Sequence, residues 1–186
     1  MKIALFISDK IGIKLYNFLR KNNKNVILIV SRNKNILNYF KNTKTNTVFY
    51  KKNKNDDIIV KELIDKNIDL SIVFKFCILP KKIWNLPKYK TINMHYSLLY
   101  SYSGPNPVEW QIHNKEKESG VSIVFISNKI DNGPIIVQEK INIVNKSITK
   151  VKNELDILGR KCILEAINLI EKYKKEVPII KSIYIY

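Results

Sequence analysis

Two polar residues, Asn93 and His95, are separated by one apolar residue in the stretch TINMHYSLL, residues 91–99. In an extended chain alternate side chains point to the same face, so these two would project together, about 6–7 Å apart along the strand. A neutral imidazole can accept a proton from an amine, while an imidazolium and a carboxamide can donate hydrogen bonds to a developing oxyanion. Residues of these types at this spacing therefore suit the transfer of an acyl group to an amine.

A histidine in this role needs a carboxylate that orients it and balances its charge. Asp131 is the candidate, because it lies in a predicted turn, next to Asn132-Gly133-Pro134, after an apolar strand pattern. The residue types alone leave a second interpretation open, in which His95 is a hydrogen-bonded core histidine and Asp131 only forms the turn. No cysteine–histidine cluster has the spacing of a metal site, so we expect no metal.

Strand and helix patterns alternate in the first half of the chain. Apolar runs rich in Val and Ile predict the strands, and apolar residues at helical spacing predict the helices. The strands are expected at residues 1–8, 25–30, 47–50 and 69–76, and the helices at residues 11–22 and 56–66. This alternation predicts an α/β fold with a doubly wound, mostly parallel, Rossmann-like sheet. In such sheets the functional site lies outside the carboxyl ends of the strands.

The second half predicts further elements of the same domain. Residues 120–126 and 135–144 are expected as strands, and the longest helical pattern covers residues 151–174. The final segment, IIKSIYIY, is apolar and could add an edge strand or lie against a partner such as a second copy of the chain. We therefore expect one compact domain of residues 1–186, in which residues 151–186 form a C-terminal helix and an apolar tail. Trp110 is expected in the core or in a pocket wall, and Glu116 in solvent.

The net charge of +17 comes from 33 Lys and Arg against 16 Asp and Glu. Arg occurs only at Arg20, Arg32 and Arg160, although Arg favours bidentate contact with phosphate. We interpret Lys as the default surface residue of this chain, with a dedicated nucleic-acid face as the alternative. Such a surface would in either case attract an acidic or phosphorylated substrate.

Neither a membrane span nor a signal peptide is expected. The longest apolar runs, such as residues 26–30, are too short to cross a bilayer. The N-terminal stretch MKIALFISDK is too short for a signal-peptide core and predicts a first strand. Cys77 and Cys162 match no redox or metal spacing, so we expect two free thiols in a reducing cytoplasm.

Residues 91–138 resemble the active-site half of the formyltransferases that use N10-formyltetrahydrofolate. That family includes methionyl-tRNA, glycinamide ribonucleotide and sugar N-formyltransferases, and its fold is a Rossmann-like sheet of the formyltransferase type. Its pattern runs Asn-x-His-x-Ser-Leu-Leu, a tyrosine and glycine loop, a bulky residue, Thr/Ser-Gly-Val and Asp-x-Gly. The matching residues here are Asn93, His95, Ser97, Leu98, Leu99, Tyr102, Gly104, Pro107, Trp110, Ser119, Gly120, Val121, Asp131 and Gly133. Residues 1–19 and 73–84 fit the same family more loosely, so the resemblance covers about residues 1–142.

The resemblance implies roles for particular residues. It implies that Asn93 donates to the formyl oxygen, that His95 assists proton movement or stabilises the oxyanion, and that Asp131 keeps His95 oriented. The implied co-substrate is N10-formyltetrahydrofolate, without a metal. The residues implied to contact its pteridine are Phe76, Cys77, Ile78, Leu79, Ser127, Asn128, Ile130 and Asp131. The residues expected on the acceptor side are Tyr96, Ser97, Tyr102 and Gly104.

Departures from the family pattern bear on the acceptor. Tyr100 stands where the family often has proline, and Ser103 where it often has arginine. The loop at residues 8–12 lacks the glycine- and serine-rich phosphate cradle of the ribonucleotide enzymes, and no residues are left for the C-terminal β domain of the tRNA enzymes. Elimination therefore favours a small amine, such as a nucleotide-linked amino sugar, with methionyl-tRNA and glycinamide ribonucleotide as alternatives.

Two functions of other kinds stay open. A hydrolase of the same fold would use the same three side chains to release formate by attack of water. A basic nucleic-acid-binding module would have kept the fold and lost the chemistry. The partners that we expect are a small-molecule amine or a tRNA, and a second copy of the chain is a further candidate.

Overall fold

The computed structural model describes residues 1–174 and 176–179. The chain divides into two compact units, residues 1–92 and the part that begins at Asn93. The strands follow the order β3-β2-β1-β4-β5-β6-β7 in one sheet, in which β5 (Thr91–His95) belongs partly to each unit. The predicted α/β class and mostly parallel sheet are therefore confirmed.

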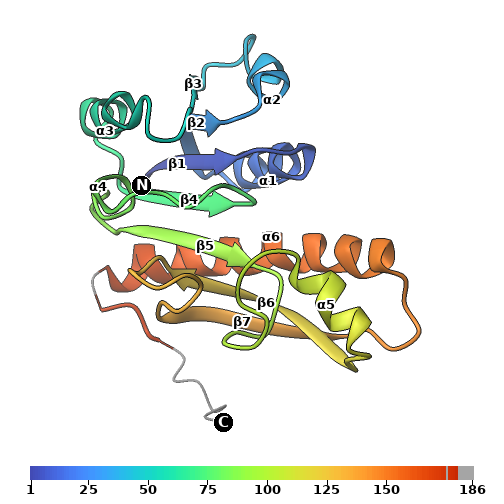
Figure 1. Cartoon of the computed structure of the whole chain (residues 1–186). Helices are drawn as coiled ribbons and strands as arrows, with labels where there is room; N and C mark the ends of the chain where they lie inside the picture. Colours follow the sequence, from blue (N-terminus) through green and yellow to red (C-terminus); the bar gives the residue numbers. More distant parts are fainter. Residues whose placement is uncertain (175, 180–186) are drawn as a thin grey trace. The chain divides into compact units, whose positions relative to one another are not determined.

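The first unit alternates strands and helices along the chain. Its strands are β1 (Lys2–Ile7), β2 (Asn25–Ser31), β3 (Asn46–Phe49) and β4 (Leu70–Phe74), and they pair in parallel (Figure 1). Its helices are α1 (Lys10–Lys21), α2 (Lys34–Tyr39), α3 (Asp56–Asp65) and α4 (Lys81–Trp84). Strand β1 lies between β2 and β4, and every residue of it after Lys2 is fully buried. This burial agrees with its sequence, because parallel strands that are covered on both faces are apolar throughout.

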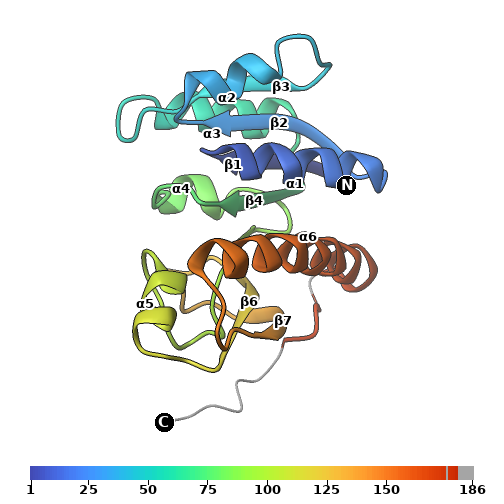
Figure 2. The same ribbon diagram turned by 90° about the vertical axis from the view of Figure 1, so that its right-hand side faces the viewer.

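The second unit is built around an antiparallel pair of strands. Strands β6 (Glu118–Phe125) and β7 (Ile135–Asn142) pair antiparallel, with Ser122 opposite Gln138. The long helix α6 (Ile148–Tyr173) runs along both strands, and the short helix α5 (Pro107–His113) packs against it (Figure 2). The apolar stripe of α6 is buried, as its helical spacing predicted.

Several elements differ from expectation. The alternating stretch that begins at Thr91 ends at His95, because the chain then enters a hydrogen-bonded turn. The short helices α2 and α4 escape detection, since six and four residues hold too little apolar periodicity. Residues 180–186 of the predicted apolar tail lie outside the described residues. None of the described helices is both long and apolar enough to cross a bilayer.

The expectation that Trp110 lies in the core is wrong, while a place in a pocket wall stays a prediction. Its side chain is 57% exposed and meets the edge of the His113 ring. Helix α5 has only two turns and buries Val108 and Gln111, so Trp110 falls on the opposite face.

Candidate active site

Asn93 and His95 lie at the third and last positions of strand β5. They alternate with Ile92 and Met94, whose side chains are buried. His95 is 8% exposed and Asn93 is half-buried. The alternation of polar and apolar residues in the sequence is therefore a real division between two faces of this strand.

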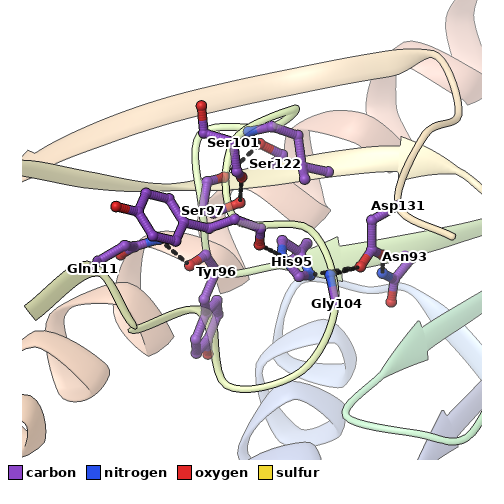
Figure 3. A network of polar contacts seen from close by, with 11 residues as sticks. Asn93, His95, Tyr96, Ser97, Ser101, Gly104, Gln111, Ser122 and Asp131 are labelled. Carbon is purple, nitrogen blue, oxygen red and sulfur yellow. Dashed lines mark hydrogen bonds and ion pairs between the residues drawn. The ribbon is translucent and has the colours of Figure 1, made fainter. Parts of the chain in front are cut away.

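The structure brings Asp131 to these two side chains, from the turn after β6. Its Oδ1 accepts a hydrogen bond from the Asn93 amide at 3.1 Å, and its Oδ2 lies 3.5 Å from His95 Nδ1 (Figure 3). The backbone N–H of Gly104 also donates to Oδ2, at 2.9 Å. One carboxylate thus contacts both members of the pair and a loop between β5 and α5.

The other nitrogen of His95 fixes the tautomer of the ring. Nε2 lies 2.8 Å from the carbonyl oxygen of Tyr102, and a carbonyl only accepts, so Nε2 carries the hydrogen. A neutral ring in this tautomer turns the lone pair of Nδ1 towards Asp131. The imidazolium donates from both nitrogens, and it then forms an ion pair with the carboxylate.

Buried hydrogen bonds hold the turn that follows His95. The Ser122 hydroxyl donates to the carbonyl of Ser97 at 2.7 Å and accepts from the N–H of Leu99 at 3.1 Å. The Gln138 amide donates to Ser122 and to the carbonyl of Leu99. Strands β6 and β7 therefore fix the direction in which the chain leaves β5.

A second buried pair supports the same turn from α5. The Gln111 amide donates to the carbonyl of Tyr96 at 3.1 Å, and the Ser119 hydroxyl donates to Gln111 Oε1 at 2.5 Å. Tyr96 and Ser97 are 5% and 0% exposed, and the Ser97 hydroxyl donates to the carbonyl of Ser101. Contact of these two side chains with an acceptor, expected from the sequence, stays a prediction and requires this turn to open.

The two segments expected to contact a pteridine lie in different units. In the first unit, Phe76–Leu79 follow β4 without regular structure; Ile78 is 60% exposed and Leu79 is buried. Burial raises the pKa of the Cys77 thiol, although Arg32 acts in the opposite direction. Cys77 is half-buried and is not part of a disulfide.

In the second unit, residues 127–131 form a turn in which residues 128–130 are exposed and Asp131 is half-buried. The Ser127 hydroxyl donates to the carbonyl of Lys129 at 2.9 Å and accepts from its N–H, while Asn128 is exposed and Ile130 is 59% exposed. Asp131 itself has a φ of 49°, in the left-handed region that Asp tolerates better than most residues. The roles of both segments in binding a pteridine stay predictions.

Sequence reasoning missed several contacts of this site. Tyr100, noted only as a departure from the family pattern, donates from its hydroxyl to the carbonyl of Gly133 at 3.1 Å. Glu116 is exposed, as expected, and it also accepts a hydrogen bond from the Tyr102 hydroxyl at 2.6 Å. No spacing in the sequence indicates these pairs, because each joins two separate loops. In the described part of the chain no group of His, Cys, Asp and Glu has the arrangement of a metal site.

Comparison with known proteins identifies the family of this chain. The family model described as formyl transferase matches residues 1–167. The chain belongs to the formyl transferase family. A curated relative is the methionyl-tRNA formyltransferase of Bacteroides thetaiotaomicron, 36% identical over 116 residues, which are 62% of this chain and 36% of the relative. The alignment thus spans little more than a third of the length of that curated relative.

Solved structures of a formyltransferase and of a formyltetrahydrofolate deformylase share the fold. The phosphoribosylglycinamide formyltransferase of Anaplasma phagocytophilum superposes with a TM-score of 0.84 at 22% identity, covering 92% of this chain and 87% of that one. A formyltetrahydrofolate deformylase of Pseudomonas syringae pv. tomato superposes with a TM-score of 0.83 at 15% identity, covering 92% of this chain and 62% of that one. These likenesses describe the fold and leave the acceptor of this family member to be argued separately.

Proposed function

We propose that this chain transfers a formyl group from N10-formyltetrahydrofolate to a primary amine. The observation that carries the proposal is the contact of one carboxylate, Asp131, with the Asn93 amide and the His95 imidazole in a member of the formyl transferase family. In this reaction a new carbon–nitrogen bond forms to the amine and the bond to the folate nitrogen breaks. The amine loses a proton and the folate nitrogen gains one.

The side chains suit these steps. Asn93 uses one amide hydrogen on Asp131, and its second finds no acceptor within the described residues, so it can donate to an oxygen that gains negative charge. His95 and Asp131 together can take up the proton that the amine releases. The formyl folate supplies the formyl group. Phe76–Leu79 and residues 127–131 are the proposed contacts of its pteridine.

As acceptor we propose the amino group of methionyl-tRNA. The curated relative reported above carries that name, and the charge of the chain supports a polyanionic partner. Residues 1–92 hold 20 of the 33 Lys and Arg but only 6 of the 16 Asp and Glu, which gives the first unit +14 of the total of +17. A surface of this charge favours association with nucleic acid. The nucleotide-linked amino sugar favoured by elimination gains no support from the relatives reported above.

An assay of donor consumption and product mass tests both statements. Purified protein is given N10-formyltetrahydrofolate with methionyl-tRNA, with a nucleotide-linked amino sugar, with glycinamide ribonucleotide, or with no amine. We expect formylmethionyl-tRNA and free tetrahydrofolate in the first reaction only. A formamide of one of the small amines would replace the proposed acceptor while supporting formyl transfer. Formate released equally without an amine would instead support a hydrolase.

Binding measurements separate the enzyme from a basic nucleic-acid-binding module. An enzyme of this kind should bind a non-reactive folate analogue as well as tRNA. Steeply salt-dependent RNA binding with no folate affinity and no formyl product would overturn the proposal. A cytoplasmic location and a homodimer stay predictions from the sequence.

A further inference from the structure

One loop contacts both members of the histidine–aspartate pair. Residues 96–106 connect β5 to α5, and within them the Tyr102 carbonyl accepts from His95 Nε2 at 2.8 Å. Two residues further on, the N–H of Gly104 donates to Asp131 Oδ2 at 2.9 Å (Figure 3). A shift of the loop at Tyr102 would therefore move hydrogen-bonding partners of both His95 and Asp131.

The backbone at Tyr102 needs an anchor to stay in place. Its φ is 55°, in the left-handed region, which residues other than Gly, Asn and Asp adopt infrequently. Such a conformation persists only where surrounding contacts hold it. Gly104, with a φ of 92°, has no neighbouring atom within 4 Å of the position a Cβ would take, so the space beside its Cα is open.

The side chain of Tyr102 supplies that anchor. Its hydroxyl donates to Glu116 Oε1 at 2.6 Å and accepts from the Asn114 amide at 3.0 Å. Asn114 and Glu116 lie in the turn between α5 and β6, which the Glu116 N–H closes by donating to the carbonyl of Gln111. A hydrogen bond to a carboxylate is among the stronger ones available to a neutral hydroxyl.

The phenol keeps the proton that this contact requires. Partial burial raises the pKa of Tyr102, and the hydrogen bond to Glu116 raises it further, while the Asn114 amide acts in the opposite direction. Tyr102 therefore remains a donor to Glu116 throughout the neutral and mildly alkaline range.

We propose that Tyr102 and Glu116 are positioning residues, which hold the loop so that the Tyr102 carbonyl fixes the Nε2–H tautomer of His95 and Gly104 fixes Asp131. The expected effect of these residues on catalysis rests on the proposed function, whereas the positioning of His95 does not. The Tyr102 hydroxyl is already engaged by Glu116 and Asn114, and contact of Tyr102 with an acceptor stays a separate prediction.

Nuclear magnetic resonance of the imidazole nitrogens tests the positioning itself without an activity assay. The chain has only two histidines, so His113 is an internal reference. At a pH where the ring is neutral, we expect a pure Nε2–H pattern for His95 in the wild type. In Tyr102→Phe and Glu116→Ala we expect values averaged between the two tautomers, with His113 unchanged. His95 nitrogen shifts identical to wild type in both variants would overturn the proposal, whatever the reaction proves to be.

Steady-state kinetics test the consequence for catalysis. We expect Tyr102→Phe and Glu116→Ala to lower kcat about tenfold, on the scale of one hydrogen bond to a charged group, with the KM for the formyl donor within about twofold. Glu116→Gln keeps an acceptor for the hydroxyl and should restore most of kcat. Tyr39→Phe removes a matched exposed hydroxyl, bonded to Asn17 in the first unit, and should leave kcat unchanged.

Two kinetic results would contradict the inference. A rise in kcat in Tyr102→Phe would mean that the Tyr102 carbonyl obstructs His95 instead of orienting it. Equal losses in Glu116→Gln and Glu116→Ala would mean that the carboxylate charge, and not the hydrogen bond to Tyr102, is what matters. If the wild type shows no formyl transfer but the imidazole signals change as expected, the proposed function fails while the positioning role stands.

Discussion

At the scale of single residues, Asp131 is the centre of the candidate site. Its two oxygens accept hydrogen bonds from the Asn93 amide and from the Gly104 N–H. His95 Nδ1 lies 3.5 Å from Oδ2. A carboxylate held by these donors leaves the second amide hydrogen of Asn93 for another acceptor. This arrangement suits a reaction in which an oxygen gains charge while an amine loses a proton.

Removal of either polar side chain of β5 should abolish most of the activity. We expect Asn93→Ala and His95→Ala each to lower turnover about 100-fold, the usual scale for an oxyanion donor or a general base. The measurement is the rate of formyl transfer at saturating donor, with thermal unfolding to show that the variants remain folded. His113→Ala is the matched control, because it removes the other histidine, at the end of α5, and should retain the wild-type rate. Unchanged turnover in both β5 variants would refute the assigned roles.

At the scale of elements, two turns carry residues of the candidate site. The turn after β5 carries Tyr102 and Gly104, and the turn after β6 carries Asp131 and Gly133. Tyr100 joins them through its hydrogen bond to the carbonyl of Gly133. The second turn is also closed tightly, since the N–H of Phe125 donates to the carbonyl of Pro134 at 3.0 Å.

A methyl group at Gly133 should disrupt the turn that holds Asp131. A Cβ there would overlap the carbonyl oxygen of Phe125, which is backbone and cannot rotate away. We expect Gly133→Ala to lower the free energy of unfolding by about 2–3 kcal/mol or more, as for other overpacked sites, in urea titrations. Gly104→Ala is the comparison, because space is open there and only the positive φ is strained, so about 1 kcal/mol is expected. Equal stability of Gly133→Ala and wild type would show that the turn relaxes freely.

At the scale of the whole molecule, the distribution of charge matters more than its total. The first unit carries +14, and the part that begins at Asn93 carries the remaining +3, as 13 Lys and Arg against 10 Asp and Glu. In the first unit, three lysines are exposed in the loop after β3, namely Lys51, Lys52 and Lys54. A uniform compositional bias would charge both units alike, so this asymmetry favours a polyanion-binding role for the first unit.

The acceptor KM should therefore depend on salt. If methionyl-tRNA is the acceptor, we expect its KM to rise about tenfold or more from about 50 to about 200 mM salt, which corresponds to release of counterions from a few phosphates. The KM of the formyl donor should change far less. Substitution of Lys51, Lys52 and Lys54 by Gln should reduce the salt dependence of the acceptor KM.

A charge-matched variant provides the control for that measurement. Lys150, Lys161 and Lys172 are exposed on α6 in the second unit, so their substitution by Gln removes the same charge elsewhere. This variant should keep the wild-type salt dependence. An acceptor KM indifferent to salt in the wild type would indicate that the lysines are only a solvated surface and that the acceptor is small.

The sequence by itself determined the four strands and the helices α1 and α3 of the first unit, the shared face of Asn93 and His95, and the turn at Asp131. These features depend on periodicity and on residue preferences that act over a few positions. Only the tertiary structure decided that the Asp131 carboxylate meets both side chains of β5. It alone decided that Tyr102 contacts His95 and Gly104 contacts Asp131, that Glu116 anchors Tyr102, and that Trp110 faces solvent. Those contacts join separate turns, and their meeting depends on strand order, on left-handed backbone positions and on packing, which no local pattern encodes.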